Sequence, residues 1–244
     1  MKGKKIKKIV QEKYSEIASN NCSCNCSCNS SKGIAKEIGY SEEETQKFSE
    51  ANLGLGCGNP VAMSRIREGD IVVDLGSGAG FDAFIAADKV GLEGKVIGID
   101  MTEKMIERAR MNAERYNYKN VEFKLGDIEN VPLPDNFADV IISNCVINLA
   151  PDKDKVFREA YRILKKGGRI YISDIVLLKE LDREQMNDEN LLVGCVAGAL
   201  QKKDYIDKIK RAGFQVNILG EDTEISKKQY SGIALESLKV EGVK

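Results

Sequence analysis

Histidine is the most informative absence in this 244-residue chain, which contains none. The side chain that most often acts as a general base near neutral pH is therefore missing, and zinc sites built from cysteine and histidine together are excluded. Any chemistry that needs a base must use another group. Cysteine, by contrast, occurs seven times. In a cytosolic protein such cysteines are more often reduced thiols with metal-binding or chemical roles than parts of a disulfide framework.

Two further absences limit the partners of the chain. There is no excess of positive charge, because the formal net charge is -1 and the isoelectric point is about 5.9, so we expect no nucleic-acid partner. The apolar run Leu191–Leu200 is too short to span a membrane. The Lys-rich N-terminus also lacks the apolar region of a signal peptide. We therefore expect a cytoplasmic protein with no membrane partner.

A glycine-rich segment carries the strongest functional signal. The apolar run Ile71–Val73 is typical of a buried central strand, and Gly76, Gly78 and Gly80 then allow a sharp turn against which a ligand can lie directly. The spacing G-x-G-x-G differs from the G-x-G-x-x-G of nicotinamide-binding proteins. Asp74, which precedes the first glycine, suits a ligand that carries positive charge. S-adenosylmethionine has both an ammonium and a sulfonium group.

The strands expected after this one are also followed by polar groups or a thiol. These strands span residues 95–99, 121–125 and 138–143, and Asp100, Asp127 and the pair Asn144-Cys145 follow them. Each polar residue alone is typical of a helix cap or a turn. In an open parallel sheet, however, the carboxyl ends of the strands form the edge that binds ligands. We therefore expect Asp100 to bind the two ribose hydroxyls of an adenosine and Asp127 to act through the adenine amino group.

The alternation of strands and helices predicts a doubly wound, Rossmann-like α/β sheet with right-handed crossovers. Helices are expected at residues 4–18, from a capping box at Ser41 to about residue 51, from Pro60 through Ile66, at 81–90 and 103–116, and from Pro151 to the pair Gly167-Gly168; further strands are expected at 169–177, 214–219 and 230–240. We divide the chain into an N-terminal helical and cysteine-rich segment, residues 1–60, and a cofactor-binding domain, residues 61–244. Residues 178–213 of that domain are expected to cap the ligand edge.

The cysteines fall into two groups. Four alternate within a stretch built almost wholly from Asn, Ser and Cys, namely Cys22, Cys24, Cys26 and Cys28. That stretch has too little apolar bulk to order itself, and its thiols either bind a soft ion or are exposed without such a role. Among the others, Cys57 lies between glycines that leave its side chain accessible, which favours a functional role. Cys195 on its own is better explained as a buried apolar residue.

Three segments together resemble the arsenite S-adenosylmethionine methyltransferases, a family of the class I methyltransferase superfamily. They are Asp74–Asp82, Asn144–Leu149 and Gly194–Leu200, and the resemblance covers roughly residues 50–220. The first segment marks only the superfamily, whereas the two cysteine segments combined with Gly-Cys57-Gly are more specific. The resemblance implies a seven-stranded methyltransferase fold and an arsenite methyltransferase that serves arsenic detoxification. It also implies methylated arsenicals as products and a thiol reductant such as thioredoxin or glutathione.

The resemblance further implies roles for individual residues. Cys57, Cys145 and Cys195 would hold trivalent arsenic and act in catalysis, with Cys195 contributed by the cap, and one N-terminal cysteine would take part in redox steps. The predicted cofactor-binding residues are Asp74, Gly76, Ser77, Gly78, Gly80, Asp100, Met101, Asp127, Ile128 and Asn144. Arsenic(III) is soft and keeps a lone pair when three thiolates bind it. Attack by that lone pair on a sulfonium methyl needs alignment and desolvation rather than proton removal, which suits a chain without histidine.

Two other functions remain open on the residues alone. A methyltransferase that acts on an oxygen, nitrogen or carbon atom of a small organic molecule shares this fold. It would need a base, and the sequence offers no obvious Lys or Tyr at the strand end where Cys145 stands. A soft-metal binding or sensing protein would instead use the C-x-C-x-C-x-C stretch as its main site.

Overall fold

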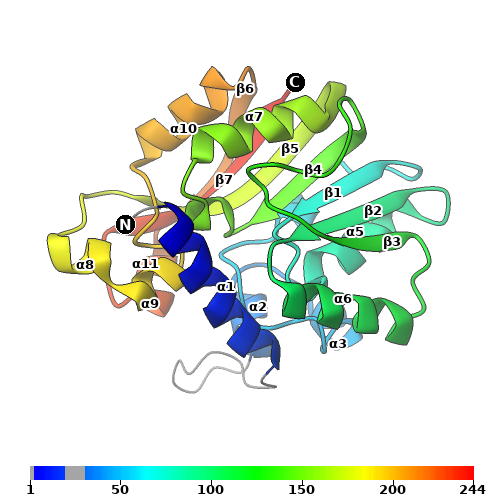
Figure 1. The fold of residues 1–244 in the computed structure, drawn as a ribbon, viewed down its shortest axis with the longest axis horizontal. Helices are drawn as coiled ribbons and strands as arrows, with labels where there is room; N and C mark the ends of the chain where they lie inside the picture. Colours follow the sequence, from blue (N-terminus) through cyan, green and yellow to red (C-terminus); the bar gives the residue numbers. More distant parts are fainter. Residues whose placement is uncertain (1–2, 20–30) are drawn as a thin grey trace.

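The computed structural model describes residues 3–19 and 31–244 and is built around one seven-stranded sheet (Figure 1). In the order in which they pair, the strands are β3 (Val121–Leu125), β2 (Lys95–Asp100), β1 (Ile71–Leu75), β4 (Ala138–Asn144), β5 (Leu164–Leu177), β7 (Leu235–Val243) and β6 (Gln215–Asp222). The doubly wound, Rossmann-like fold is thereby confirmed. The stretch that contains Cys22, Cys24, Cys26 and Cys28 lies outside the described residues.

Strand pairing explains why one edge of the sheet can bind a ligand. β1 pairs in parallel with both β2 and β4, so the strand order reverses at β1 and a crevice forms there. β3 and β5 extend the parallel part on the two sides, whereas β7 runs antiparallel to β5 and β6. The carboxyl ends of the five parallel strands β1 to β5 therefore share one edge, which we call the ligand edge.

Helices cover both faces of the sheet. Along β1, Val72 belongs to one apolar cluster and Val73 to another, because successive side chains of a strand point to opposite faces. The first cluster includes residues of α5 (Phe81–Val90) and α6 (Glu103–Arg115); the second includes residues of α7 (Lys153–Ile163) and α10 (Lys202–Arg211). Figure 1 shows these two pairs of helices on opposite sides of the sheet. Burial on both faces fixes the strands and so the loops at the ligand edge.

Shorter helices and the N-terminal helix surround the ligand edge. They are α1 (Gly3–Ser19), α2 (Ser31–Glu37), α3 (Glu42–Lys47), α4 (Pro60–Met63), the 3₁₀ helix η1 (Ile147–Leu149), α8 (Arg183–Asn187), α9 (Glu189–Val193) and α11 (Glu224–Gln229). α1 packs against both α6 and α9 and so bridges the two sides of this edge (Figure 1). None of the described helices is both long and apolar enough to cross a membrane.

The capping box predicted at Ser41 is confirmed, but the two short helices near it are shorter than expected. Ser41 Oγ accepts a hydrogen bond from the Glu44 backbone N–H, and the Glu44 carboxylate accepts one from the Ser41 N–H. α3 nevertheless ends at Lys47 rather than near residue 51. α4 begins at Pro60 as predicted and has ended before it reaches Ile66.

Two other boundaries are corrected by strand pairing and by a turn. α7 ends at Ile163 because the next residue, Leu164, already pairs with Ala138 in the sheet, so the pair Gly167-Gly168 lies within β5 instead of ending the helix. The last strand begins at residue 235 rather than 230, since α11 and a turn precede it. Ser231 and Gly232 make that turn at φ values of +52° and +80°.

Candidate active site

A cavity of about 970 Å³ lies at the ligand edge, between the ends of the strands and helix α1. Its wall includes eleven of the predicted site residues: Asp74, Gly76, Ser77, Gly78, Asp100, Met101, Asp127, Ile128, Asn144, Cys145 and Cys195. Gly80 is not part of the wall; it adopts φ +96° and turns the chain into α5. Cys57 is buried and is not part of the wall either. The fold therefore gathers these residues from five separate parts of the chain.

The glycine loop after β1 is shaped by backbone hydrogen bonds and by a close side chain. The N–H groups of Gly76 and Ser77 both donate to the Ile99 carbonyl, at 2.8 and 3.0 Å. Gly76 has φ +74°, and a Cβ at this position would lie 2.2 Å from Val146 Cγ2. Because of both constraints, a glycine is required here. The loop thus runs past the end of β2, where Asp100 lies.

Asp100 is buried at the end of β2 and is held by two backbone groups. Its Oδ2 accepts a hydrogen bond from the Gly78 N–H at 3.0 Å, and its Oδ1 accepts one from the Thr102 N–H at 2.8 Å. Burial raises the pKa of Asp100, and these two hydrogen bonds act in the opposite direction. The carboxylate is therefore fixed in one orientation beside the cavity.

Two buried polar atoms on the cavity wall are available to a ligand. Within residues 3–19 and 31–244, Asp74 Oδ2 and Ser77 Oγ have no hydrogen-bond partner. Burial, together with the nearby Asp82 and Asp100, raises the pKa of Asp74 well above its ordinary value. A buried carboxyl group without a partner is costly, and a cation placed against it would remove that cost. The donor set therefore fits the positively charged cofactor that the sequence predicts.

A hydrogen-bond network behind the glycine loop was not predicted from the sequence. Tyr40 donates to Asp82 Oδ1 at 2.6 Å, and Asn144 Nδ2 lies 3.1 Å from Asp82 Oδ2. The same Nδ2 also donates to the Gly58 carbonyl at 2.8 Å, while Asn144 Oδ1 accepts from the Cys57 N–H at 3.1 Å. Burial raises the pKa of Asp82 to about 6 although these hydrogen bonds lower it. The Asn144 side chain thus joins the cofactor loop to the loop that carries Cys57.

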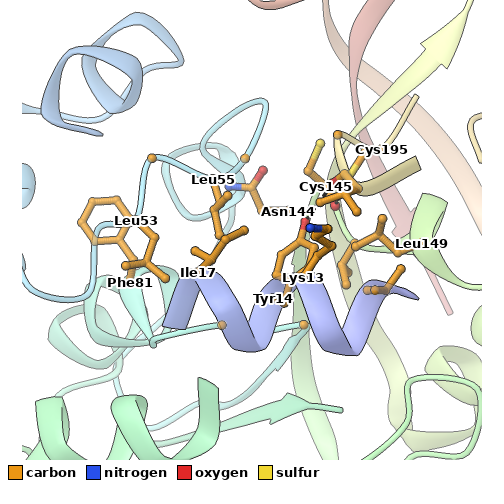
Figure 2. A pocket seen from close by; sticks show the side chains of 18 of the residues that line it. Lys13, Tyr14, Ile17, Leu53, Leu55, Phe81, Asn144, Cys145, Leu149 and Cys195 are labelled. Carbon is orange, nitrogen blue, oxygen red and sulfur yellow. Dashed lines mark hydrogen bonds between the residues drawn. The ribbon is translucent and has the colours of Figure 1, made fainter. Parts of the chain in front are cut away.

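Helix α1 covers the other side of the cavity. Its wall residues are Lys7, Val10, Lys13, Tyr14 and Ile17, which recur at helical spacing and so share one face (Figure 2). Lys7 Nζ forms ion pairs with Asp127 Oδ2 at 2.5 Å and with Glu129 Oε2 at 2.6 Å. Asp127 is therefore engaged with α1, a contact that its spacing after β3 could not predict.

The three cysteines singled out in the sequence lie together beside the glycine loop. The Cys195 thiol donates to the Cys145 carbonyl oxygen at 2.6 Å, and both residues have positive φ angles, +66° and +56°. The Sγ atoms of Cys57 and Cys145 and a carboxylate oxygen of Asp174 all lie within 4.8 Å of one another. All three cysteines are buried and free. A cluster of buried thiols at the end of a binding cavity can hold a soft ion.

The surroundings of Cys145 and Cys195 raise the pKa values of both thiols and so favour their protonated form. Hydrogen bonds with Cys195 and Cys57, followed by burial, raise the pKa of Cys145 well above 9.0. The hydrogen bond with Cys145 is the largest influence on the pKa of Cys195 and lowers it, but burial and the nearby Asp174 and Cys57 together raise it further, so the net change is upward. Asp174 is also buried, and burial raises its pKa to about 7 even though the Tyr205 hydroxyl donates to its Oδ2 at 2.9 Å.

Two tyrosines from distant segments complete the surroundings of the thiols. Tyr14 of α1 donates to the Val193 carbonyl at 3.2 Å and also lies within hydrogen-bonding reach of the Cys195 side chain. Tyr230, just after α11, lines the same cavity as Cys145 and Cys195. Burial raises the pKa of both phenols well above 10.0, so both keep their protons. Their separation in sequence left no pattern from which this contact could be predicted.

Comparisons with known proteins agree with the fold and with the family that the sequence resembles. Residues 66–213 match the family model described as a methyltransferase domain. An arsenite methyltransferase of Halobacterium salinarum is 46% identical over 182 residues, which cover 74% of this chain and 46% of the relative. The human arsenite methyltransferase is 38% identical over 168 residues, or 65% of this chain and 44% of the relative. The chain thus spans about half the length of the curated relatives it matches.

Solved structures add to this comparison. The arsenic(III) S-adenosylmethionine methyltransferase of Chlamydomonas reinhardtii is 33% identical, with a TM-score of 0.68 over 86% of this chain and 73% of that chain. A phosphoethanolamine N-methyltransferase of Haemonchus contortus, solved with S-adenosyl-L-methionine, shares the fold at 18% identity and a TM-score of 0.66. The chain therefore belongs to the arsenite methyltransferase family of the S-adenosylmethionine-dependent class I methyltransferases.

Proposed function

We propose that this protein transfers methyl groups from S-adenosylmethionine to trivalent arsenic held by Cys57, Cys145 and Cys195. The observation that carries the proposal is the cluster of three buried free cysteines beside the glycine loop, of which Cys145 and Cys195 line the cavity. Thiolates are the protein ligands that soft ions prefer. The family membership supports the same substrate, and arsenic detoxification is the role we infer.

Arsenic can bind to these thiols without a protein base, because the proton of each thiol leaves with a hydroxyl group of arsenous acid as water. When arsenous acid meets the Cys145 thiol, an As–S bond and an O–H bond form while the S–H and As–O bonds break, and water leaves. Three such exchanges leave the arsenic neutral and pyramidal, with its lone pair free. The raised pKa of Cys145 does not prevent this exchange, because the leaving hydroxyl group takes the thiol proton. The absence of histidine from the chain is thus compatible with the reaction.

The cofactor would be held by the glycine loop and by the acids around it. Asp100 would accept hydrogen bonds from the ribose hydroxyls, while Asp74 and Ser77 would use the buried atoms that lack partners among the described residues. S-adenosylmethionine supplies an electrophilic methyl carbon on a sulfonium. Met101, Ile128 and the remaining glycines of the loop would pack against it. We assign Asn144 to the support of this site, since its side chain is already engaged with Cys57 and Asp82.

A thiol reductant and a cytoplasmic location complete the proposal. The thiols of Cys57, Cys145 and Cys195 must be reduced to exchange with arsenous acid, and a reducing compartment keeps them so. A small thiol of the glutathione type or a thioredoxin-like protein would serve as the reductant. We assign no arsenic-binding role to the four N-terminal cysteines, so replacing them tests whether they form the main site of a sensor.

The experiment is arsenic speciation after incubation of the purified protein with S-adenosylmethionine, glutathione and arsenite. We expect methylated arsenic from the wild-type chain, and none from Cys145→Ser or Cys195→Ser, because serine offers a hard, protonated oxygen in place of a soft thiolate. Cys57→Ser should fail on arsenite but still methylate methylarsonous acid, which has only two positions left for thiolates. Cofactor affinity should be unchanged in all three variants.

The control is the variant in which Cys22, Cys24, Cys26 and Cys28 are all serine. It should still bind arsenite at the cavity. If this variant loses stoichiometric arsenite binding and the wild-type chain transfers no methyl group, the sensor function is correct and the proposed one is wrong. If the protein methylates a small organic acceptor and leaves arsenite unchanged, the alternative function is supported instead, a methyltransferase that acts on an oxygen, nitrogen or carbon atom.

A further inference from the structure

Helix α1 brings one hydroxyl group to the thiol cluster, that of Tyr14. Figure 2 shows the Tyr14 side chain pointing from α1 toward the part of the cavity where Cys145 and Cys195 lie. The hydroxyl donates to the carbonyl of Val193, the last residue of α9, at 3.2 Å. Cys195 follows two residues later, and its side chain is within hydrogen-bonding reach of the same hydroxyl. The Tyr14 hydroxyl therefore has two acceptors and only one hydrogen to share between them.

The thiol itself is already engaged as a donor. The Cys195 S–H points to the Cys145 carbonyl oxygen at 2.6 Å, and both cysteines are buried. Formation of an As–S bond at Cys195 removes that hydrogen: the S–H and As–O bonds break, the As–S and O–H bonds form, and water leaves. The sulfur, now bonded to Cβ and to arsenic, has no hydrogen left and can no longer donate to the Cys145 carbonyl. A hydrogen-bond donor aimed at the sulfur becomes favourable at that moment.

We propose that Tyr14 is a positioning residue for the arsenic site, whose hydroxyl turns from the Val193 carbonyl to the Cys195 sulfur when arsenic binds there. This inference rests on the proposed function, because it requires arsenic on Cys195. It assigns α1 a second task besides covering the cofactor. Helix α1 contacts Asp127 through Lys7 and would position Cys195 through Tyr14. Its packing therefore connects the cofactor-binding residues with the arsenic-binding cysteines.

Tyr14→Phe tests the proposal, since it keeps the ring and removes only the hydroxyl. Every variant, and the reference chain, carries serine at positions 22, 24, 26 and 28, so that those thiols do not compete for arsenic. We expect arsenite affinity to fall about tenfold in Tyr14→Phe, the loss that one hydrogen bond to a partly charged sulfur implies. Affinity for S-adenosylhomocysteine should change less than about twofold. The matched control is Tyr118→Phe, which removes a hydroxyl that donates to Asp88, a residue outside the cavity wall.

A second arm separates positioning from a general weakening of the fold. Methylarsonous acid binds two thiols, so it is titrated into chains that retain either Cys145 with Cys195 or Cys57 with Cys145. In the Cys57→Ser chain, which retains Cys195, Tyr14→Phe should lower the affinity for methylarsonous acid about tenfold. In the Cys195→Ser chain, the same substitution should leave this affinity unchanged. An equal loss in both chains would show that Tyr14 only supports packing, and no loss in either would show that its hydroxyl stays on Val193. Either result overturns the inference.

Failure of the inference and failure of the proposed function give different results. If the reference chain binds neither arsenite nor methylarsonous acid, the proposed function fails and Tyr14 has no arsenic ligand to position. If the reference chain binds both and Tyr14→Phe binds them equally well, only the inference fails.

Discussion

Replacement of Asp82 by asparagine should stabilise the ligand-free protein at alkaline pH. Burial raises the pKa of this carboxyl from 3.8 to about 6. The folded state therefore holds the proton more tightly than the unfolded state, and stability falls as the pH rises from about 4 to about 6 and then stays constant. A difference of about two units corresponds to roughly 3 kcal/mol of lost stability above this range. The side chain introduced by Asp82→Asn does not ionise and would avoid that cost.

The substitution also disturbs one hydrogen bond, which sets the net change. The asparagine side chain can still accept from the Tyr40 hydroxyl, but its amide group would face the Nδ2 of Asn144, at a cost of about 1 kcal/mol. We therefore expect the variant to be about 2 kcal/mol more stable than wild type at pH 8, and about 1 kcal/mol less stable near pH 4, where the wild-type carboxyl is protonated.

Urea unfolding of the ligand-free chain, followed by circular dichroism at both pH values, measures this difference. The control is Asp204→Asn, which removes an exposed aspartate of α10 and should change stability by less than about 0.5 kcal/mol. A difference between wild type and Asp82→Asn that is the same at both pH values would refute the reasoning, because a change in packing does not titrate.

The same substitution, Asp82→Asn, should weaken cofactor binding although it stabilises the ligand-free protein at alkaline pH. Asp74, Asp82 and Asp100 all line the cavity, so a cationic ligand gains from the negative charge that destabilises the ligand-free protein. Asp82→Asn should weaken S-adenosylmethionine by about tenfold more than S-adenosylhomocysteine, which lacks the sulfonium charge. Calorimetry at pH 8 with both ligands measures the ratio. Equal losses for the two ligands would mean that Asp82 does not sense the sulfonium.

Three further substitutions test other parts of the site. Asp100→Ala should weaken S-adenosylmethionine about a hundredfold by calorimetry, since two charge-assisted hydrogen bonds are lost; unchanged affinity would exclude the ribose role. Lys7→Met should speed amide hydrogen exchange of α1 about tenfold, because its ion pairs with Asp127 and Glu129 hold the helix; unaltered exchange would contradict this. Gly76→Ala should lower thermal stability by about 2 to 4 kcal/mol, because Cβ would clash with the Val146 side chain; wild-type stability would show that the loop relaxes.

The sheet and most of its helices could be predicted because their signals are local. The apolar run at residues 71–73, the capping box at Ser41 and the proline that begins α4 each act within a few residues. Boundaries failed where a distant partner decided them. Leu164 belongs to a strand because Ala138 pairs with it, and no pattern around residue 164 contains that information.

The site was predictable only along single segments. The glycine loop follows β1 and Asp100 ends β2, and neighbouring parallel strands of this fold end at the same edge. Their closeness could therefore be predicted from the fold. Tyr14, Tyr40 and Tyr230 come from three segments outside that order, and each reaches the site through a tertiary contact. Asp82 was visible within the glycine motif, yet its role depends on Tyr40, 42 residues earlier in the chain.

The absence of histidine and the raised pKa values of Cys145 and Cys195 have related consequences for the site. Under the proposed function, thiols can react with arsenous acid while protonated, because each leaving hydroxyl group takes its proton from a cysteine. Hydrogen bonding and burial keep Cys145 in that form at neutral pH. A neighbouring imidazolium would lower this pKa and favour the thiolate, which is the form that oxidants attack. Burial without histidine would therefore protect the thiols, while the proposed substrate, arsenous acid, would supply the base that the exchange needs.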